Sequence, residues 1–417
     1  MEKYIINGGN RLTGEISIQG AKNSVLPILA ASVISGKTST IHNVPRLRDV
    51  DIMIKILNSL GSKIVVDDNI VNIDSSEINN LSLPEELVRE MRSSIILMGA
   101  LLSRFGEVKI AFPGGCEIGP RPIDLHLKSL RQMGAIIEES HGFLDCKTTG
   151  LKGCDIQLDY PSVGATENII LAAVTAEGIT TIRNAAREPE LIDLQNYLNE
   201  AGAKVIGAGT SIIIIEGVKS LNSCNHIIIP DRIVAGTYMT AAAITKGEVI
   251  IKNIITDHLL SIIAKLKEAG VIIYANGSSL KVIGPNKLYA LEMLQTLPYP
   301  GFPTDMQAQL MTLLSIANGT SIINETIFEN RFKHAEELTR MGASIKTFGK
   351  VAVIKGVKEL TGAKVFAKDL RGGAALVLAG LVAQGTTEIE NIYHICRGYE
   401  NMESNLKKLG VDIRMDK

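Results

Sequence analysis

LNEAGAKVI, at residues 198–206, is one of six copies of a phrase that decides the fold. The other copies are LNSLGSKIV at 57–65, LRQMGAIIE at 130–138, LKEAGVIIY at 266–274, LTRMGASIK at 338–346 and LKKLGVDIR at 406–414. Their glycines stand at 61, 134, 202, 270, 342 and 410, so successive copies are separated by 68 to 73 residues. This regular spacing indicates six copies of one supersecondary unit.

The third copy shows how each unit is interpreted. Residues 164–178, GATENIILAAVTAEG, predict an apolar helix, 178–184 a strand, and 189–202 an amphipathic helix that ends at its glycine. Residues 203–217 predict two strands joined by a glycine turn. The unit is therefore βαβαββ, and helices that alternate with strands predict an α/β layer structure.

The first helix of every unit is apolar on all sides, which predicts that it is buried. These helices are expected at 21–34, 91–103, 164–176, 231–244, 304–316 and 369–383. A solenoid of identical stacked units is the alternative architecture that such a repeat allows.

The two ends of the chain favour closure. The sixth copy stops at VDIRMDK without its return strands, whereas KYIINGG and GEISIQG precede the first buried helix and look like the missing strands. We therefore expect the N-terminus to complete the last copy.

A chain of 417 residues exceeds the size of about 250–300 residues at which single cores stop growing. With three copies per domain, we expect one domain at 21–229 and the other at 1–20 and 230–417. The first would carry Cys116 and the second Asp305 and Arg397. Substrate sites favour clefts between domains, so the active site is expected in the interdomain cleft.

Composition excludes several classes of protein. The net charge is −1 and no run of Lys and Arg occurs, so we expect no nucleic-acid partner and no membrane partner. The N-terminus lacks the apolar core of a signal peptide, and no apolar run approaches the ~18 residues of a membrane span. Five cysteines without a CxxC pair argue against disulfides and a zinc site. A cytoplasmic protein without a metal is expected.

The loop PGGCEIGPRPIDLH at 113–126 presents the most reactive group of the chain. Two glycines allow a tight turn before Cys116, and prolines stiffen the segment that carries Arg121. A guanidinium near a thiol stabilises the thiolate, so this cysteine could act as nucleophile or proton donor. The alternative is a small buried loop residue, because free Cys is among the most buried residue types.

Several buried helices begin with polar residues that an apolar helix does not need. They are Lys22, Asn23, Arg92, Ser93, Arg232, Asp305, Asp369 and Arg371. Helix N-termini with Lys and Arg predict an anion site. Asp305 and Asp369 have a second explanation, because a carboxylate at a helix start is favourable to the dipole.

Loops that follow a β-strand carry a second set of cations. Arg121, Arg187, Arg331 and Arg397 occupy corresponding places in four repeats, although solvated surface arginines are the alternative. Guanidinium groups bind phosphates and carboxylates bidentately. A multiply charged phosphate or carboxylate substrate is therefore predicted.

Eight motifs occur in order over the whole chain as they do in the UDP-N-acetylglucosamine 1-carboxyvinyltransferases, an enolpyruvyl transferase family that this chain resembles. They are QGAKNSVLP, PGGCEIGPRPIDLH, SVGAT, AAREPE, FPTDMQAQ, FENRF, DLR and RGYE. The resemblance implies two inside-out, barrel-like α/β domains of three repeats each. It also implies transfer of the enolpyruvyl group of phosphoenolpyruvate to the 3'-hydroxyl of UDP-N-acetylglucosamine, the first committed step of peptidoglycan precursor synthesis. Phosphate is released, and no cofactor is implied.

The resemblance also implies roles for single residues. Cys116 corresponds to the general acid that protonates the methylene carbon of phosphoenolpyruvate and can form a covalent adduct. Asp305 corresponds to the carboxylate that takes the proton of the sugar hydroxyl. Lys22, Arg121 and Arg397 resemble the clamps on the phosphate and carboxylate of phosphoenolpyruvate.

The remaining implied contacts fall into two groups. Residues that line the same cleft correspond to Arg331, Asp369 and Arg371. Nucleotide-sugar contacts correspond to Asn23, Arg92, Arg121, Pro122, Ile123, Asp124, Leu125, Ser162, Val163, Gly164 and Ile327. Tyr160 departs from the family pattern, because some members carry Lys at this position.

Two alternatives remain beside this function. The sister enzyme of the shikimate pathway shares the fold and the donor, but it lacks a cysteine loop like PGGCEIGPRP and opens its first buried helix with a PGSKS-like phrase instead of QGAKN. A non-catalytic repeat scaffold would carry equivalent loops of equivalent composition, whereas each of these loops carries a different functional group.

Overall fold

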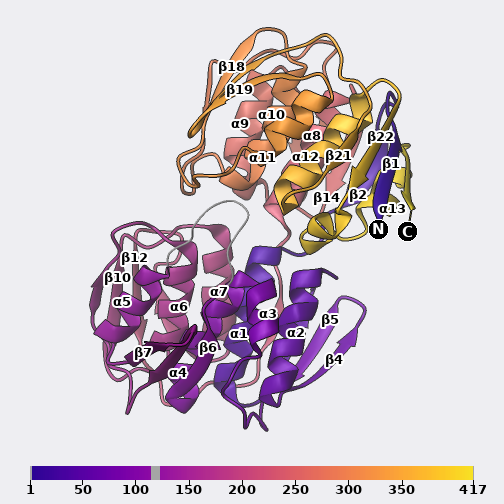
Figure 1. Ribbon diagram of the computed structural model, residues 1–417. Helices are drawn as coiled ribbons and strands as arrows, with labels where there is room; N and C mark the ends of the chain where they lie inside the picture. The colour runs from indigo at the N-terminus through magenta and orange to yellow at the C-terminus, as the bar shows by residue number, and fades with distance from the viewer. Residues whose placement is uncertain (1, 114–122, 417) are drawn as a thin grey trace. The chain divides into compact units, whose positions relative to one another are not determined.

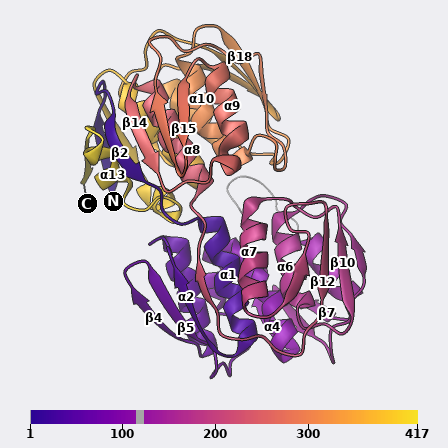
Figure 2. The same cartoon turned by 180° about the vertical axis from the view of Figure 1, so that it is seen from behind.

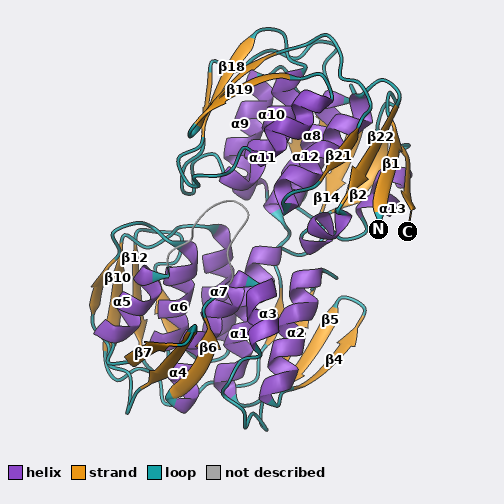
Figure 3. Ribbon diagram, in the orientation of Figure 1, coloured by secondary structure: helices purple, strands orange, loops and turns teal. Residues whose placement is uncertain are grey.

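The computed structural model describes residues 2–113 and 123–416, which form two compact units. The described residues of the first unit lie between Gly20 and Ile229. The second unit combines the chain up to Gln19 with the chain from Pro230 onward. In each unit, helices fill the interior and sheets lie around them (Figures 1 and 3).

The described part of the first unit contains three sheets, with strand orders β13-β3-β5-β4, β6-β8-β7 and β11-β12-β10-β9. Its helices are α1 (Lys22–Ser35), α2 (Arg48–Leu60), α3 (Glu85–Glu90), η1 (Arg92–Ile96), α4 (Leu97–Phe105), α5 (Asp124–Gln132), α6 (Val163–Ala173) and α7 (Pro189–Glu200). Its strands are β3 (Thr38–His42), β4 (Lys63–Asp67), β5 (Ile70–Asp74), β6 (Glu107–Ala111), β7 (Ile136–Ser140), β8 (Phe143–Lys147), β9 (Asp155–Gln157), β10 (Ile179–Arg183), β11 (Lys204–Ile206), β12 (Ile212–Glu216) and β13 (Asn225–Ile227).

The described part of the second unit also contains three sheets, with orders β15-β16-β14-β2, β17-β18-β20-β19 and β21-β22-β1-β23. Its helices are α8 (Arg232–Ile244), η2 (Thr256–Leu259), α9 (Leu260–Glu268), η3 (Thr304–Met306), α10 (Gln307–Ser315), α11 (Lys333–Arg340), α12 (Leu370–Val382), η4 (Ile392–Arg397) and α13 (Met402–Lys408). Its strands are β1 (Lys3–Asn7), β2 (Thr13–Ser17), β14 (Glu248–Lys252), β15 (Ile272–Asn276), β16 (Ser279–Ile283), β17 (Met293–Gln295), β18 (Thr320–Asn324), β19 (Ser344–Phe348), β20 (Val351–Lys355), β21 (Lys364–Phe366), β22 (Thr386–Glu390) and β23 (Asp412–Asp416).

The six apolar helices are buried, as predicted. In α1 every residue from Ser24 to Ile34 is buried, and in α12 every residue from Arg371 to Leu381. The helix α4 packs on α1 and α6, and α10 packs on α8 and α12, so each unit has a core of three such helices. Two of the helices begin differently from the prediction, because the 3-10 turns η1 and η3 precede α4 and α10.

The six repeat glycines end the amphipathic helices. All of them have a positive φ, between 92° and 112°. This conformation costs an L-residue free energy but suits glycine, which explains why the same residue closes each helix. At Gly61 the backbone N–H donates to the carbonyl of Asn58, which closes α2.

The N-terminal strand completes the sixth repeat, as predicted. β1 lies between β22 and β23 and is antiparallel to both. The sequence interpretation was wrong about the rest of this sheet, because β23 is itself one of the two return strands. Only one strand had to come from the N-terminus, and Tyr4 and Ile6 of that strand are buried in the core of the second unit.

The segment GEISIQG was also misassigned, because it is not a return strand. It forms β2, which runs parallel to β14 in the sheet of the fourth repeat (Figure 2). In exchange, β13, which opens the fourth repeat, runs parallel to β3 of the first repeat. Alternating apolar residues predict a strand but not its partner, so the sequence pattern could not separate these assignments.

We expect Ile6→Ala to destabilise the second unit. The side chain is fully buried in a central strand, and a buried Ile truncated to Ala costs about 2–5 kcal/mol. Urea unfolding gives the free energy. Lys3→Ala on the same strand is the control, since its ion pair with Glu388 lies at the surface, where such pairs contribute little to stability. Equal losses from both substitutions would contradict a core position for β1.

Candidate active site

The cysteine loop is described only at its two flanks. Cys116, Arg121 and Pro122 lie outside the described residues, so the roles predicted for them stay predictions. Phe112 and Pro113 on one side and Ile123 on the other belong to the first unit.

The most compact group of predicted site residues lies in the second unit, around Asp305. One carboxylate oxygen accepts a hydrogen bond from Nη2 of Arg331 at 2.7 Å. The other oxygen accepts from Nε and Nη2 of Arg371 at 3.1 and 3.0 Å. Both arginine side chains are at most 4% exposed, whereas that of Asp305 is 26% exposed. The structure therefore joins residues 305, 331 and 371, which are far apart in sequence.

The two arginines hold Asp305 in its ionised form. Burial by itself raises the pKa of this carboxyl, but the charges of Arg371 and Arg331 and their hydrogen bonds outweigh burial. The pKa of Asp305 therefore lies well below its usual range. Asp305 can accept a proton, but the two cations make it a weak base.

Each arginine keeps one nitrogen that no described residue binds. Nη1 of Arg331 and Nη1 of Arg371 are buried and have no hydrogen-bond partner within the described residues. An unsatisfied buried donor costs about 1–3 kcal/mol, and more when it is charged. An anionic ligand would supply the missing acceptors, so the pair is suited to bind a carboxylate or a phosphate.

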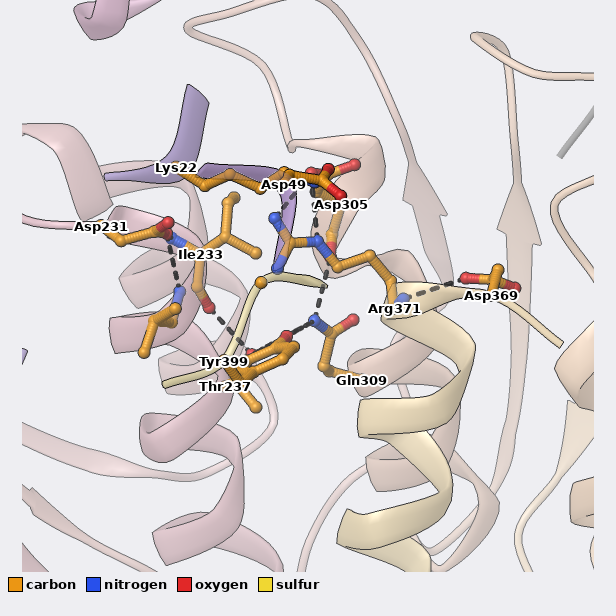
Figure 4. Close-up of polar contacts among 12 residues, drawn as sticks. Lys22, Asp49, Asp231, Ile233, Thr237, Asp305, Gln309, Asp369, Arg371 and Tyr399 are labelled. Atoms are coloured by element: carbon orange, nitrogen blue, oxygen red, sulfur yellow. Dashed lines mark hydrogen bonds and ion pairs between the residues drawn. The ribbon is translucent and has the colours of Figure 1, made fainter. Parts of the chain in front are cut away.

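On the side away from Asp305, Arg371 lies against a network of neutral side chains. Its guanidinium lies 5.5 Å from the centroid of the Tyr399 ring, between that ring and Asp305 (Figure 4). The Tyr399 hydroxyl is 2.9 Å from Oγ1 of Thr237 and accepts from Nε2 of Gln309 at 3.2 Å. Gln309 also donates to the backbone carbonyl of Asp305 at 2.9 Å. This network fixes the start of α10 and the plane of the guanidinium.

Asp369 caps a helix, which agrees with the second of its two predicted explanations, a carboxylate at a helix start. Its carboxylate accepts from the backbone N–H groups of Arg371 and Gly372 at 2.9 and 2.8 Å, at the start of α12. Asp231 caps α8 in the same way.

Arg397 ends η4, which packs on α12. Of the second-unit candidates, Ile327 lies in the loop between β18 and Arg331, and its side chain is half-buried.

In the first unit, Lys22 opens α1 and pairs with a residue that the sequence analysis missed. Its Nζ lies 2.6 Å from Oδ2 of Asp49, whose side chain is 2% exposed. Figure 4 draws this pair as well. Asp49 lies in the first turn of α2, where acidic residues are common, so nothing in the sequence distinguishes it as a partner of Lys22. Asn23 follows on α1 and is exposed.

The predicted nucleotide-sugar residues of the first unit gather at the starts of η1, α5 and α6. Arg92, Ile123 and Asp124 line a hollow of about 540 Å³. The other lining residues are Phe112, Pro113, Leu127, Lys128, Arg131 and Glu139. Lys128 and Arg131 are cations that the motifs did not single out.

The start of α6 lies against α5. Ser162 caps α6 by accepting from the backbone N–H of Ala165, and Val163 and Gly164 form its first turn. At Gly164 an added Cβ would lie 3.2 Å from the ring of His126, so a larger residue would require this ring to shift by a few tenths of an ångström. Leu125 precedes His126 on α5, and Tyr160, two residues before the cap, is 43% exposed.

His126 ties three of these elements together. Its Nδ1 lies 3.0 Å from Nδ2 of Asn168 on α6, and Asn168 also donates to the carbonyl of Ile95 in η1. Burial, together with the charge of Arg92, lowers the pKa of His126 to about 4. A neutral imidazole therefore acts here as a hydrogen-bond acceptor within the core.

No group of three or more His, Cys, Asp or Glu side chains in residues 2–113 and 123–416 could hold a metal ion. In the same residues, no helix combines the length and the apolar character that a membrane span requires.

Comparison with known proteins agrees with the fold and narrows the function. The sequence profile of the family described as EPSP synthase (3-phosphoshikimate 1-carboxyvinyltransferase) matches residues 6–406. UDP-N-acetylglucosamine 1-carboxyvinyltransferase 2 of Caldanaerobacter subterraneus subsp. tengcongensis is 56% identical over 413 residues, which cover 99% of each chain. The enzyme of the same name from Carboxydothermus hydrogenoformans is 54% identical over 415 residues, again 99% of each.

Solved structures are similar over the full length as well. The enolpyruvyl transferase NikO of Streptomyces tendae superimposes with a TM-score of 0.90 at 26% identity, covering 99% of this chain and 98% of its own. An EPSP synthase of Acinetobacter baumannii gives 0.75 at 18% identity over all of both chains, which shows a common fold. These likenesses confirm the predicted class of inside-out α/β domains.

We expect His334 to make stability depend on pH. This residue of α11 is 2% exposed, and burial, with the charge of Arg331, lowers its pKa from 6.5 to about 4. Between these values the unfolded chain binds more protons, so stability contributed by the neutral ring is complete above pH 6.5 and is lost as pH falls toward 4. His334→Gln should therefore lose less stability than the wild type on acidification, by up to about 3 kcal/mol in urea unfolding.

His141→Asn is the matched control, because His141 is exposed in the turn between β7 and β8. This variant should follow the pH dependence of the wild type. Parallel curves for the wild type and His334→Gln would show that the imidazole of His334 is not buried in its neutral form.

Proposed function

This chain belongs to the EPSP synthase family of enolpyruvyl transferases, and from that premise we propose that it transfers the enolpyruvyl group of phosphoenolpyruvate to the 3'-hydroxyl of UDP-N-acetylglucosamine. Identity of 56% over 99% of the chain, to a relative named for this activity, is the observation that carries the choice of acceptor. The reaction releases phosphate and begins peptidoglycan precursor synthesis. We propose the cytoplasm as the compartment of the protein, in keeping with the N-terminus, which lacks the apolar core of a signal peptide.

The chemistry needs one acid and one base. Cys116 donates a proton to the methylene carbon of phosphoenolpyruvate, which gives the adjacent carbon oxocarbenium character. The sugar hydroxyl then attacks this carbon and gives its proton to Asp305. In the second step the new methyl group returns a proton to the Cys116 thiolate, the bond to the phosphate oxygen breaks, and the double bond returns as phosphate leaves. A positioned acid and a positioned base supply both ends of this sequence.

The arginine pair determines how strong a base Asp305 is. The carboxylate is ionised, as a proton acceptor must be, but Arg331 and Arg371 stabilise its charge. Anionic groups of the donor bound at the two free Nη1 nitrogens would share the positive charge. The pKa of Asp305 would then rise, so donor binding would strengthen the base.

The remaining candidates divide between the two substrates. We assign Lys22, Arg121 and Arg397 to the phosphate and carboxylate of phosphoenolpyruvate, because these anionic groups bind cationic side chains. The net charge of the chain is −1, so single Lys and Arg residues have to supply the positive charge at the site. Asp369 supports this region by holding the first turn of α12, which carries Arg371.

Nucleotide-sugar binding is assigned to residues at helix starts and in one loop. They are Asn23, Arg92, Arg121, Pro122, Ile123, Asp124, Leu125, Ser162, Val163, Gly164 and Ile327. The hollow lined by Arg92, Ile123 and Asp124 supports this assignment, since it offers both apolar surface and hydrogen-bonding groups.

The second candidate function is transfer to shikimate 3-phosphate, because the matching family profile bears the description of that enzyme. Phosphate release from phosphoenolpyruvate should be measured with each acceptor in turn. We expect release with UDP-N-acetylglucosamine and none above background with shikimate 3-phosphate. The opposite result would overturn the proposed acceptor.

Substitutions at Cys116 test the proposed acid. Cys116→Asp should keep substantial activity, because a carboxylic acid can donate a proton at similar reach, whereas Cys116→Ser should lose about 100-fold or more, because a hydroxyl is far too weak an acid. Steady-state phosphate release measures both. Cys146→Ser is the control, since this thiol is fully buried in the core of the first unit.

An epoxide phosphonate that mimics phosphoenolpyruvate gives an independent readout. It should alkylate Cys116, inactivate the wild type and spare Cys116→Asp. Activity of Cys116→Asp as low as that of Cys116→Ala at every pH, or modification of another cysteine in place of Cys116, would exclude this residue as the acid.

A further inference from the structure

Glu325 is a buried carboxylate that the proposed chemistry does not use. It follows β18 directly, is 0% exposed, and forms no salt bridge within the described residues. Four neutral donors bind it instead. Oε1 accepts from Oγ1 of Thr296 at 2.9 Å and from the backbone N–H groups of Ile327 and Phe328 at 2.9 and 3.2 Å, and Oε2 accepts from Oγ1 of Thr304 at 2.8 Å.

These donors belong to segments that carry candidate site residues. Thr304 opens η3, and the next residue is Asp305. Ile327 is itself a candidate, and the loop it belongs to continues to Arg331. One carboxylate therefore holds the segment of the proposed base and the segment of a proposed nucleotide-sugar contact.

Thr296 also binds the residue that follows Glu325. Its Oγ1 accepts from the backbone N–H of Thr326 at 3.0 Å, and its carbonyl accepts from the hydroxyl of Thr326 at 2.6 Å. Thr296 is also fully buried. The turn after β18 is thus held to Thr296 as well as to Glu325.

A negative charge suits this position better than a neutral amide. All four neighbours donate, and a carboxylate offers two oxygens that only accept, whereas Gln would turn an NH₂ group toward one of these donors. Burying a charge without a cation costs free energy that hydrogen bonds must offset. Packing alone therefore does not explain the carboxylate.

We propose that Glu325 is a positioning residue for the acceptor side of the active site, because its carboxylate sets Asp305, through Thr304, in fixed register with the backbone of Ile327. The proposed proton acceptor, Asp305, and the proposed nucleotide-sugar contact, Ile327, then keep a fixed position relative to each other. This inference rests on the proposed function, from which the roles of Asp305 and Ile327 come.

Thr304→Val tests the link to Asp305, because it removes one hydroxyl at nearly constant volume. We expect kcat to fall about tenfold, the factor that corresponds to one charge-assisted hydrogen bond of about 1.4 kcal/mol, with the KM for phosphoenolpyruvate within about twofold of the wild type. Thr240→Val is the matched control. Its hydroxyl is equally buried in the second unit but bonds only to the Gly236 carbonyl of its own helix, so kcat should not change.

Glu325→Gln tests the link to Ile327. The backbone N–H groups of Ile327 and Phe328 lose their charged acceptor, so we expect the dissociation constant of UDP-N-acetylglucosamine, measured by calorimetry, to rise about tenfold. Thr304→Val should leave this constant unchanged. In the double variant, the loss in kcat should be smaller than the product of the two single losses, because both substitutions break one shared contact.

The outcomes separate this inference from the proposed function. If both variants melt at lower temperature but keep the wild-type kcat, KM and dissociation constant, Glu325 is a structural residue and the inference is wrong. If the wild type binds UDP-N-acetylglucosamine but releases no phosphate, the proposed reaction fails, and calorimetry on Glu325→Gln still decides the inference. A wild type that neither binds this nucleotide sugar nor turns it over would overturn both.

Discussion

A helix that is apolar on every side must be surrounded by protein, and the rest of this structure depends on that constraint. Three such helices pack together in each unit, and the hairpins and amphipathic helices of the repeats cover them. The ends of the buried helices are where polar residues can be tolerated. Lys22 at α1, Asp305 just before α10 and Arg371 at α12 all stand there, beside backbone N–H groups that favour anions. The candidate site is therefore a consequence of how the core is built.

Local patterns could be predicted from the sequence, and long-range partners could not. The repeat glycines, the buried helices and the strand at residues 3–7 follow from spacing and periodicity, which depend on neighbours in the chain. The place of β2 in the sheet of the fourth repeat depends on packing between distant segments, and the pattern of this strand suits either sheet. The contacts of Asp49 with Lys22 and of Glu325 with Thr304 likewise depend on side chains that only the fold brings together.

Asp305 with its two arginines illustrates why a buried ion pair is poor evidence for stability alone. Removing charges from water costs several kcal/mol per ion, and the mutual attraction offsets this only when every hydrogen-bonding group is satisfied. Here one nitrogen of Arg331 and one of Arg371 remain without a described partner. Nearby, His334 is kept neutral by burial although both ring nitrogens lack a partner in the described residues. This region is therefore not optimised for stability, which is typical of a site that awaits a charged ligand.

The order of the chain gives the two units different folding problems. The first unit is one continuous segment, whereas the second is complete only when β1 and β2 reach strands more than 200 residues away. Closing so long a flexible loop costs entropy and slows folding.

Folding of the first unit, which is inserted into the chain of the second, removes much of this cost. The backbone N–H of Ala21 donates to the carbonyl of Ile229 at 2.7 Å and so brings the two ends of the first unit together. Gln19 and Asp231 then need to close only a short gap, and the second unit bonds them at 2.9 Å. A pair of hydrogen bonds at residues 19–21 and 229–231 thus converts a contact between distant segments into a nearly local one.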